Sequence, residues 1–115
     1  MILNSCINDL KDSSYIRLSS IPIVPCLGSV DDSKLVKNLL TEHKIKTVYH
    51  AAAYKHVPLI EENPLEGLKN NVLGTQSLIT DCMESEVSSF VLISTDKAVR
   101  PTNVMGASKR IAEMI

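Results

Sequence analysis

Four polar residues with the sequence STDK, residues 94–97, follow directly on an apolar run near the end of the 115-residue chain. The run itself, Phe90 to Ile93, is typical of a strand buried in a parallel sheet. Such sheets bind ligands at the carboxyl ends of their strands, so these four side chains lie where chemistry is expected. Asp96 and Lys97 are of the types that exchange protons with a substrate, but they can equally form an exposed ion pair in a loop.

The chain before this candidate site alternates between strand-like and helix-like patterns. Met105 and Lys109 lie four residues apart on the last predicted helix, so their side chains share one face. Alternation on this scale is typical of a parallel sheet with right-handed crossovers, which predicts an α/β fold. Strands are predicted over residues 21–27, 46–53 and 88–94, and helices after residue 32, over residues 64–86 and over residues 104–115.

The N-terminal third carries the weaker signals. Met1 to Ser20 fits a short amphipathic helix as well as a loop, and it contains no motif. Two prolines restrict the strand predicted over residues 21–27 to an edge-like or irregular segment. Asp31 or Asp32 can cap the helix that follows. The buried face expected for this helix is formed by Leu35, Val36, Leu39 and Leu40.

The longest helix is expected to begin at Pro64, with Asn63 as its cap. Gly74 lies inside this helix, where glycine costs about 1 kcal/mol relative to alanine. We therefore expect another backbone to approach the helix closely at Gly74. The apolar stripe expected to face the core consists of Leu65, Leu68, Val72, Ile79 and Met83.

Composition argues against several classes of function. The net charge of −1 gives no electrostatic case for binding nucleic acid or an anionic membrane. The cysteines, Cys6, Cys26 and Cys82, lie far apart and are expected to be buried thiols of a reducing compartment. The histidines lack the spacing of ligands, so no metal site is expected. Because no apolar run reaches the roughly 20 residues of a membrane span and no signal peptide is recognisable, a cytoplasmic location is expected.

A strand ending in a hydroxyl residue, followed by a helix that carries Lys109, resembles the short-chain dehydrogenase/reductase superfamily. There a Ser or Thr, a Tyr and a Lys four residues after it perform hydride chemistry, and Met105 occupies the place of the Tyr in this chain. The resemblance runs from about Ile21 to the end. The stretches HAAAYKHVPLIEENP, NNVLGT, STDKA and PTNVMGASKR are similar to the polysaccharide-biosynthesis UDP-N-acetylglucosamine 4,6-dehydratases, of the type with Met at that place.

The resemblance implies NAD or NADP as the cofactor and a UDP-sugar as the substrate. In the family reaction, hydride leaves sugar C4, water is eliminated across C5–C6, and hydride returns to C6. Thr95 would hydrogen-bond the C4 oxygen, Asp96 would protonate the departing hydroxyl, and Lys97 would take the C5 proton. Lys109, with Met105 beside it in the cofactor site, would hold the nicotinamide ribose. Because Met105 cannot ionise, removal of the C4-hydroxyl proton would pass to Lys109 or to water.

The resemblance also implies contacts earlier in the chain. Val30 would hold the adenine through its backbone, whereas Ser29 stands in place of an acidic residue and would bind it more weakly. Ala51 begins a platform of small residues below the nicotinamide-side ribose, and Lys55 would contact the substrate. Asn71 would bond backbone and hold water near the catalytic Lys. From the residues alone, each position also has a purely structural explanation. Ser29 and Val30 fit a plain strand–turn–helix junction, Ala51 fits close strand–helix packing, and Asn71 fits a satisfied buried amide.

The glycine-rich phosphate loop of dinucleotide-binding domains is missing, because no G-x-G-x-x-G occurs among the 115 residues. We interpret residues 1–115 as an incomplete NAD(P)-binding domain. It is part of a Rossmann-like doubly wound parallel sheet that lacks the first strand and the C-terminal substrate region. Weak cofactor binding and self-association are expected, and full-length relatives are often membrane-anchored. A C4 epimerase fragment and a non-catalytic truncated remnant are the alternative functions.

Overall fold

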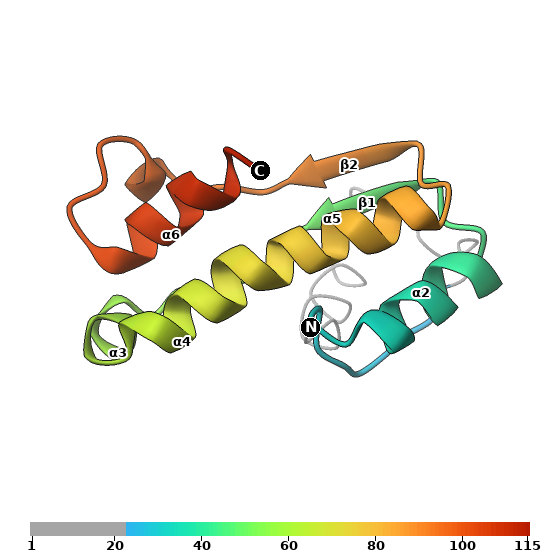
Figure 1. Cartoon of the computed structure of the whole chain (residues 1–115), viewed down its shortest axis with the longest axis horizontal. Coiled ribbons are helices and arrows are strands. Elements are labelled where there is room, and N and C mark those ends of the chain that lie inside the picture. The colour runs from blue at the N-terminus through green and yellow to red at the C-terminus, as the bar shows by residue number, and fades with distance from the viewer. Residues whose placement is uncertain (1–22) are drawn as a thin grey trace, which may run out of the picture.

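The computed structural model describes residues 23–115 (Figure 1). The helix considered for Met1 to Ser20 lies outside this range. Among the described residues, no helix is both long enough and apolar enough to cross a membrane. The elements in chain order are α2 (Ser33–Glu42), β1 (Thr47–His50), α3 (Val57–Glu62), α4 (Pro64–Leu68), the π-helical segment η2 (Lys69–Leu73), α5 (Gly74–Glu84), β2 (Ser89–Leu92), the 3₁₀ turn η3 (Asp96–Ala98) and α6 (Val104–Ala112).

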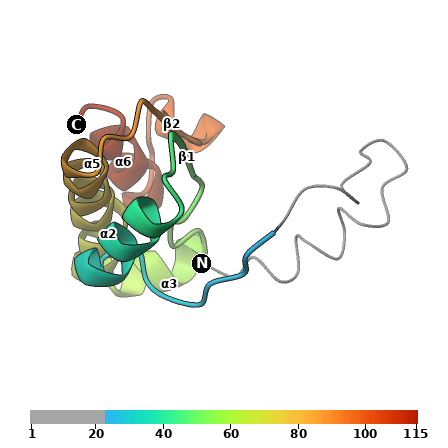
Figure 2. The same ribbon diagram turned by 90° about the vertical axis from the view of Figure 1, so that its right-hand side faces the viewer.

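The two strands form a parallel sheet, in which Thr47 pairs with Ser89 and His50 pairs with Leu92. This pairing confirms the predicted parallel arrangement. Helices α2 and α5 lie side by side against one face of the sheet (Figures 1 and 2). The core between helices and sheet consists of buried Leu40, Leu78 and Cys82 with partly buried Val36, Ile45, Val48, Val87 and Phe90.

The opposite face of the sheet is exposed, which corrects the expectation of a strand buried on both faces. Successive side chains of a strand point to opposite faces, so Val48 and Phe90 reach the core while their neighbours do not. Tyr49 is 69% exposed and Val91 is 38% exposed. Within the described residues, no element covers these two side chains.

Three predicted strands are shorter than expected or missing. Residues 23–27 form no strand, because Pro25 has no N–H and no described strand lies beside them. The strand predicted over residues 46–53 ends at His50, so the three alanines lie in the following loop. The strand predicted over residues 88–94 is confined to Ser89–Leu92. The site residues that follow each strand therefore belong to loops or turns. The sheet fixes only where each of these segments begins.

Helix α2 agrees with its predicted cap and its predicted face. The Asp32 carboxylate accepts a hydrogen bond of 3.0 Å from the backbone N–H of Leu35. Leu40 is buried, and the other three predicted side chains are half-buried. Helix α6 begins at Val104 as expected but ends at Ala112, three residues before the end of the chain. Local cap chemistry thus predicts where helices begin better than where they end.

The longest helix differs most from its prediction. It begins at Pro64, but the amide of Asn63 donates to the carbonyl of Leu59 and caps nothing. Leu65 is 81% exposed and Met83 is 77% exposed, so the predicted apolar stripe is wrong at both ends. A π turn takes one extra residue and rotates the helix faces on its two sides relative to each other. The side chains and glycines buried instead are Gly67, Asn71, Gly74, Thr75, Leu78, Asp81 and Cys82.

Candidate functional site

A groove of about 560 Å³ lies at the carboxyl end of β1. Ser29 and Val30, from the loop before α2, line it together with residues 51–55, which follow the strand. The structure therefore brings together Ser29, Val30 and Ala51, which were predicted to hold the cofactor, and Lys55, which was predicted to contact the substrate. Small side chains at residues 51–53 leave the backbone accessible from the groove.

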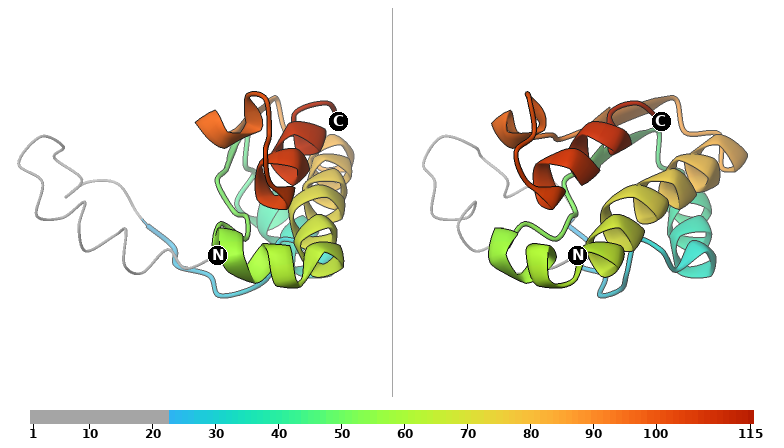
Figure 3. Two further views of the ribbon diagram at one scale, coloured as in Figure 1. Left: turned by 90° about the vertical axis from the view of Figure 1, so that its left-hand side faces the viewer. Right: turned by 60° about the vertical axis from the view of Figure 1, so that its left-hand side comes forward.

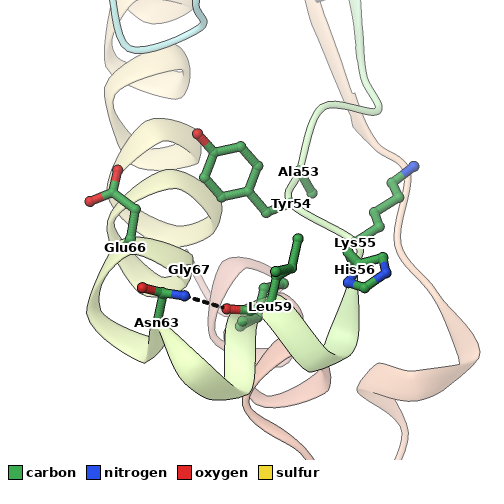
Figure 4. Close-up of a pocket in the computed structure, with 9 residues that line it drawn as sticks. Ala53, Tyr54, Lys55, His56, Leu59, Asn63, Glu66 and Gly67 are labelled. Atoms are coloured by element: carbon green, nitrogen blue, oxygen red, sulfur yellow. Dashed lines mark hydrogen bonds between the residues drawn. The ribbon is translucent and has the colours of Figure 1, made fainter.

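A second cavity, of about 380 Å³, adjoins the groove and shares residues 53–55 with it. Its walls come from the loop after β1 and from α3 and α4, and Leu59, Ile60 and Gly67 make them largely apolar. Figure 4 shows the Tyr54 ring extending toward α4 and the Lys55 side chain pointing away from that ring. Lys55 thus stands where the two cavities meet.

Thr95, Asp96 and Lys97 form a local group in the turn after β2. The Thr95 hydroxyl donates to the Asp96 carboxylate at 3.0 Å, and Lys97 Nζ lies 3.8 Å from the same oxygen. The Thr95 hydrogen bond, and then the charge of Lys97, hold the pKa of Asp96 below its usual range. The Asp96 and Lys97 side chains are 91% and 52% exposed and line neither the groove nor the second cavity. An ion pair in this setting leaves both groups open to a ligand.

The turn is held against the first turn of α6. A Cβ atom built on Gly106 would lie 2.2 Å from the Lys97 carbonyl oxygen, so only glycine allows this approach of two backbones. The Asn103 side chain caps α6 by accepting from the Gly106 N–H at 2.7 Å. The Glu61 carboxylate accepts from the Val104 N–H at 2.6 Å and ties α6 to α3. In Figure 3, α6 lies beside α4 and the helix that continues from it.

Lys109 is buried one turn further along α6. The residue is 2% exposed, and its Nζ atom has no hydrogen-bond partner in the described part of the chain. Burial lowers the pKa of Lys109, the positive charge of Lys55 lowers it further, and Glu113 opposes both effects. Met105 is 4% exposed on the same helix. Because a buried, unpaired ammonium group is costly, Lys109 is suited to an external hydrogen-bond acceptor.

Asn71 joins the groove to α6 from inside the π-helical segment. Its Oδ1 accepts from the Tyr54 N–H at 2.7 Å, and its Nδ2 donates to the Tyr54 carbonyl at 3.1 Å and to Ser108 Oγ at 2.9 Å. The predicted bonds to backbone are therefore present, and the protein alone satisfies the buried amide. The residue is fully buried.

Sequence reasoning missed three partners in this network, His50, Thr75 and Ser108. His50 Nε2 lies 2.9 Å from Thr75 Oγ1, and Ser108 Oγ donates to the Met105 carbonyl at 2.7 Å. All three side chains are buried. The available signals were Thr75 one turn after Asn71 and a histidine at a strand end, but neither identifies its partner without the fold.

Stability is expected to fall in mild acid because of His50. Burial, and to a smaller extent the charge of Lys109, lower the pKa of this imidazole from 6.5 to about 4. Between these values the unfolded chain binds a proton that the folded chain does not. The free energy of unfolding should therefore decrease as pH falls from 6.5 toward about 4, by up to about 1.4 kcal/mol per pH unit.

Urea denaturation of the chain at several pH values in this window measures the slope. His50→Gln should flatten it, whereas His43→Gln, at an exposed position after α2, should leave it unchanged. An unchanged slope in His50→Gln would show that other groups cause the acid sensitivity.

A family described as "Polysaccharide biosynthesis protein" matches residues 4–115 of the chain. The chain belongs to this family. The capsular polysaccharide biosynthesis protein CapD of Staphylococcus aureus is 54% identical over 112 residues, which are 97% of this chain and 19% of CapD. A UDP-glucose 4-epimerase of Rickettsia canadensis is 39% identical (91% of this chain, 30% of the relative). An inverting UDP-N-acetylglucosamine 4,6-dehydratase of Campylobacter jejuni is 36% identical (86% of this chain, 30% of the relative).

The fold is also similar to that of several solved structures. Pen from Bacillus thuringiensis superposes with a TM-score of 0.78 at 30% identity, over 96% of this chain and 32% of Pen. UDP-glucose 4-epimerase from Brucella ovis in complex with NAD gives a TM-score of 0.74 at 25% identity, over 77% and 32% of the two chains. The predicted fold class, part of a Rossmann-like α/β sheet, is thereby confirmed. The chain spans 19% to 30% of the length of the curated relatives named above.

Proposed function

We propose that this chain forms the central part of a nucleotide-sugar 4,6-dehydratase that acts on a UDP-N-acetylglucosamine-type substrate with NAD or NADP. The observation that carries the proposal is the groove after β1 together with the buried lysine on which the charge of Lys55 acts. Ser29, Val30 and Ala51 share a groove with Lys55, whose charge acts on buried and unpaired Lys109. The exposed pair Asp96 and Lys97 adds an acid and a base on the neighbouring strand end.

The residues present fit a dinucleotide cofactor in two respects. The orphaned ammonium of Lys109 requires an acceptor such as a ribose hydroxyl, and residues 51–53 leave room for a flat group against the backbone. The relative from Brucella ovis was solved with NAD. When bound, NAD(P)+ would supply the hydride acceptor for sugar C4 and the hydride donor for C6. Lys109 and Val30 would hold its ribose and its adenine.

Water elimination would fall to the turn after β2. Lys97 would take the proton from C5 while the hydroxyl on C6 leaves with a proton from Asp96 as water, and Thr95 would hold the C4 oxygen. The pKa of Asp96 lies below its usual range in the free chain, so its carboxyl is ionised there. Covering this exposed carboxyl with a substrate removes water from it and raises its pKa, which allows it to act as an acid.

Lys109 is our candidate for the base that accepts the C4-hydroxyl proton. Met105 stands at the place where a tyrosine would supply this function in the superfamily, and a thioether cannot ionise. Burial and Lys55 lower the pKa of Lys109, which increases the fraction of neutral amine available to accept a proton. No other cation is buried to this degree in residues 23–115.

A C4 epimerase is the second candidate, because relatives named UDP-glucose 4-epimerase match the chain at 37% to 39% identity. Epimerisation needs hydride removal and return at C4 but no elimination. It would use Lys109 and Thr95 and leave Asp96 and Lys97 without a role. The two candidates therefore differ in what these two residues do.

The test uses a chimera in which this chain replaces the matching segment of the Campylobacter jejuni dehydratase. We call it the dehydratase chimera. We expect it to convert UDP-N-acetylglucosamine to a 4-keto-6-deoxy sugar, measured by mass spectrometry as loss of water. A chimera that is folded by thermal melting and only interconverts C4 epimers would support the second candidate. A folded chimera with neither activity would contradict both.

By itself the 115-residue chain is expected to bind NAD and NADP weakly. It contains no G-x-G-x-x-G to cradle the pyrophosphate, and Ser29 offers a weaker adenine contact than an acidic residue. Isothermal titration calorimetry should give a dissociation constant well above about 1 µM, which corresponds to a binding free energy less favourable than about −8 kcal/mol. Submicromolar binding would show that the groove residues alone form a complete cofactor site.

A further inference from the structure

His50 makes a hydrogen bond whose direction can be assigned. The hydroxyl of Thr75 donates to the carbonyl of Asn71 at 2.8 Å, and a hydroxyl has only one proton. The 2.9 Å contact between Thr75 Oγ1 and His50 Nε2 therefore requires the imidazole to donate. His50 is then the neutral tautomer with its proton on Nε2. Burial and the charge of Lys109 favour the same neutral state by lowering the pKa of the ring.

Asn71 receives the hydrogen bond from Thr75 inside the π-helical segment. It lies in η2, where backbone N–H groups reach five residues back, as from Gly74 to the carbonyl of Lys69. Such π turns are rare and depend on their surroundings. The bond from Thr75 gives the Asn71 carbonyl a side-chain partner within this turn. The Asn71 amide, on the same residue, then bonds Tyr54 twice and Ser108 once.

We propose that His50 is a positioning residue, which acts through Thr75 and Asn71 to hold the groove segment 53–55 in register with Lys109 on α6. The chain of bonds starts at His50, at the end of β1, and runs through Thr75 to Asn71 in η2. From Asn71 it reaches Tyr54 beside the groove and Ser108 on α6. Every side chain in it, His50, Thr75, Asn71 and Ser108, is buried, and each proton has one assigned acceptor. His50 itself touches no reacting atom, since its Nε2 is used by Thr75.

The effect on catalysis rests on the proposed function, in which Lys55 contacts the substrate and Lys109 contacts the cofactor. Their relative position decides whether the sugar C4 lies next to the hydride acceptor. Misplacement of such groups by about 1 Å can cost about 100-fold in rate. Loss of the His50 bond is expected to lower kcat of the dehydratase chimera by about 10-fold to 100-fold.

The first test is made on the chain itself by NMR with ¹⁵N-labelled histidine and asparagine. Wild-type His50 should show a protonated Nε2 and an unprotonated Nδ1. Thr75→Val, which keeps the side-chain shape and removes the acceptor, should abolish this preference and shift the Asn71 side-chain amide signals. Thr75→Ser should keep both. A protonated Nδ1 in the wild-type chain, or Asn71 signals unmoved by Thr75→Val, would overturn the proposal.

The second test compares His50→Gln with His50→Leu in the dehydratase chimera. The amide nitrogen of Gln can donate at nearly the position of Nε2, whereas Leu fills the space without a donor. His50→Gln should keep kcat within about three-fold of the parent value. His50→Leu should lower kcat by about 10-fold to 100-fold with little change in KM. Equal kcat in the two variants would overturn the positioning role. An inactive parent chimera would contradict the proposed function alone, because the NMR test decides the bond network without activity.

Discussion

Lys97→Ala in the dehydratase chimera is expected to stop water elimination while hydride removal at C4 continues. Lys97 is the second residue of η3 in an exposed turn, where its ammonium group lies 3.8 Å from the Asp96 carboxylate, whereas Lys109 is buried. One exposed and one buried lysine suit two separate proton transfers. Loss of a positioned acid or base typically costs about 10²-fold to 10⁴-fold. The 4-keto-6-deoxy product should therefore disappear, while reduced cofactor and exchange of label at C4 remain measurable.

Two control variants define this result. Lys109→Ala should damage both half-reactions, because the same side chain is proposed to hold the cofactor and to accept the C4-hydroxyl proton. Lys34→Ala removes an exposed lysine from α2 and should change neither. Equal loss of oxidation and elimination in Lys97→Ala would show that the proposed division between the two lysines is wrong. Normal elimination in that variant would show that a group other than Lys97 takes the C5 proton.

Gly106→Ala is expected to produce the largest loss of stability among single alanine substitutions at the helix glycines. The new Cβ would lie 2.2 Å from the carbonyl oxygen of Lys97, and a backbone atom cannot move aside as a side chain can. Overpacking of this kind typically costs about 1–3 kcal/mol. The free energy of unfolding of the chain, measured by urea denaturation, should fall by this amount. The turn 95–98 should separate from α6, so the dehydratase chimera should lose elimination as well.

Gly74→Ala is the matched control, since Gly74 is also buried at a helical position. A Cβ there would meet only Val30 Cγ2 at 3.6 Å and the Lys69 carbonyl at 3.9 Å, which are ordinary contacts. Alanine is favoured over glycine inside helices by about 0.5–1 kcal/mol. Gly74→Ala should therefore be neutral or stabilising. Similar destabilisation by both substitutions would mean that the close backbone approach at Gly106 adds no energetic cost of its own.

Contacts that involve neighbours along the chain were predictable from the sequence alone. Asp32 caps α2 because its carboxylate reaches an N–H only three residues away. Pro64 and Val104 begin helices because a proline or a capped first turn determines the backbone locally. The STDK segment follows a parallel strand because an apolar run ending in polar residues must leave the sheet there. Each of these features depends on interactions within about one helical turn.

Contacts between distant residues were decided only by the tertiary structure. The bond between His50 and Thr75 spans 25 positions and that between Asn71 and Ser108 spans 37, so no local pattern announces either. The same applies to the helix glycines Gly74 and Gly106. A backbone approach was expected at Gly74 and occurs at Gly106, because it depends on where the 95–98 turn packs. Candidate site residues could thus be proposed from residue types, whereas the geometry of these residues follows from burial, which makes each polar group find a specific partner.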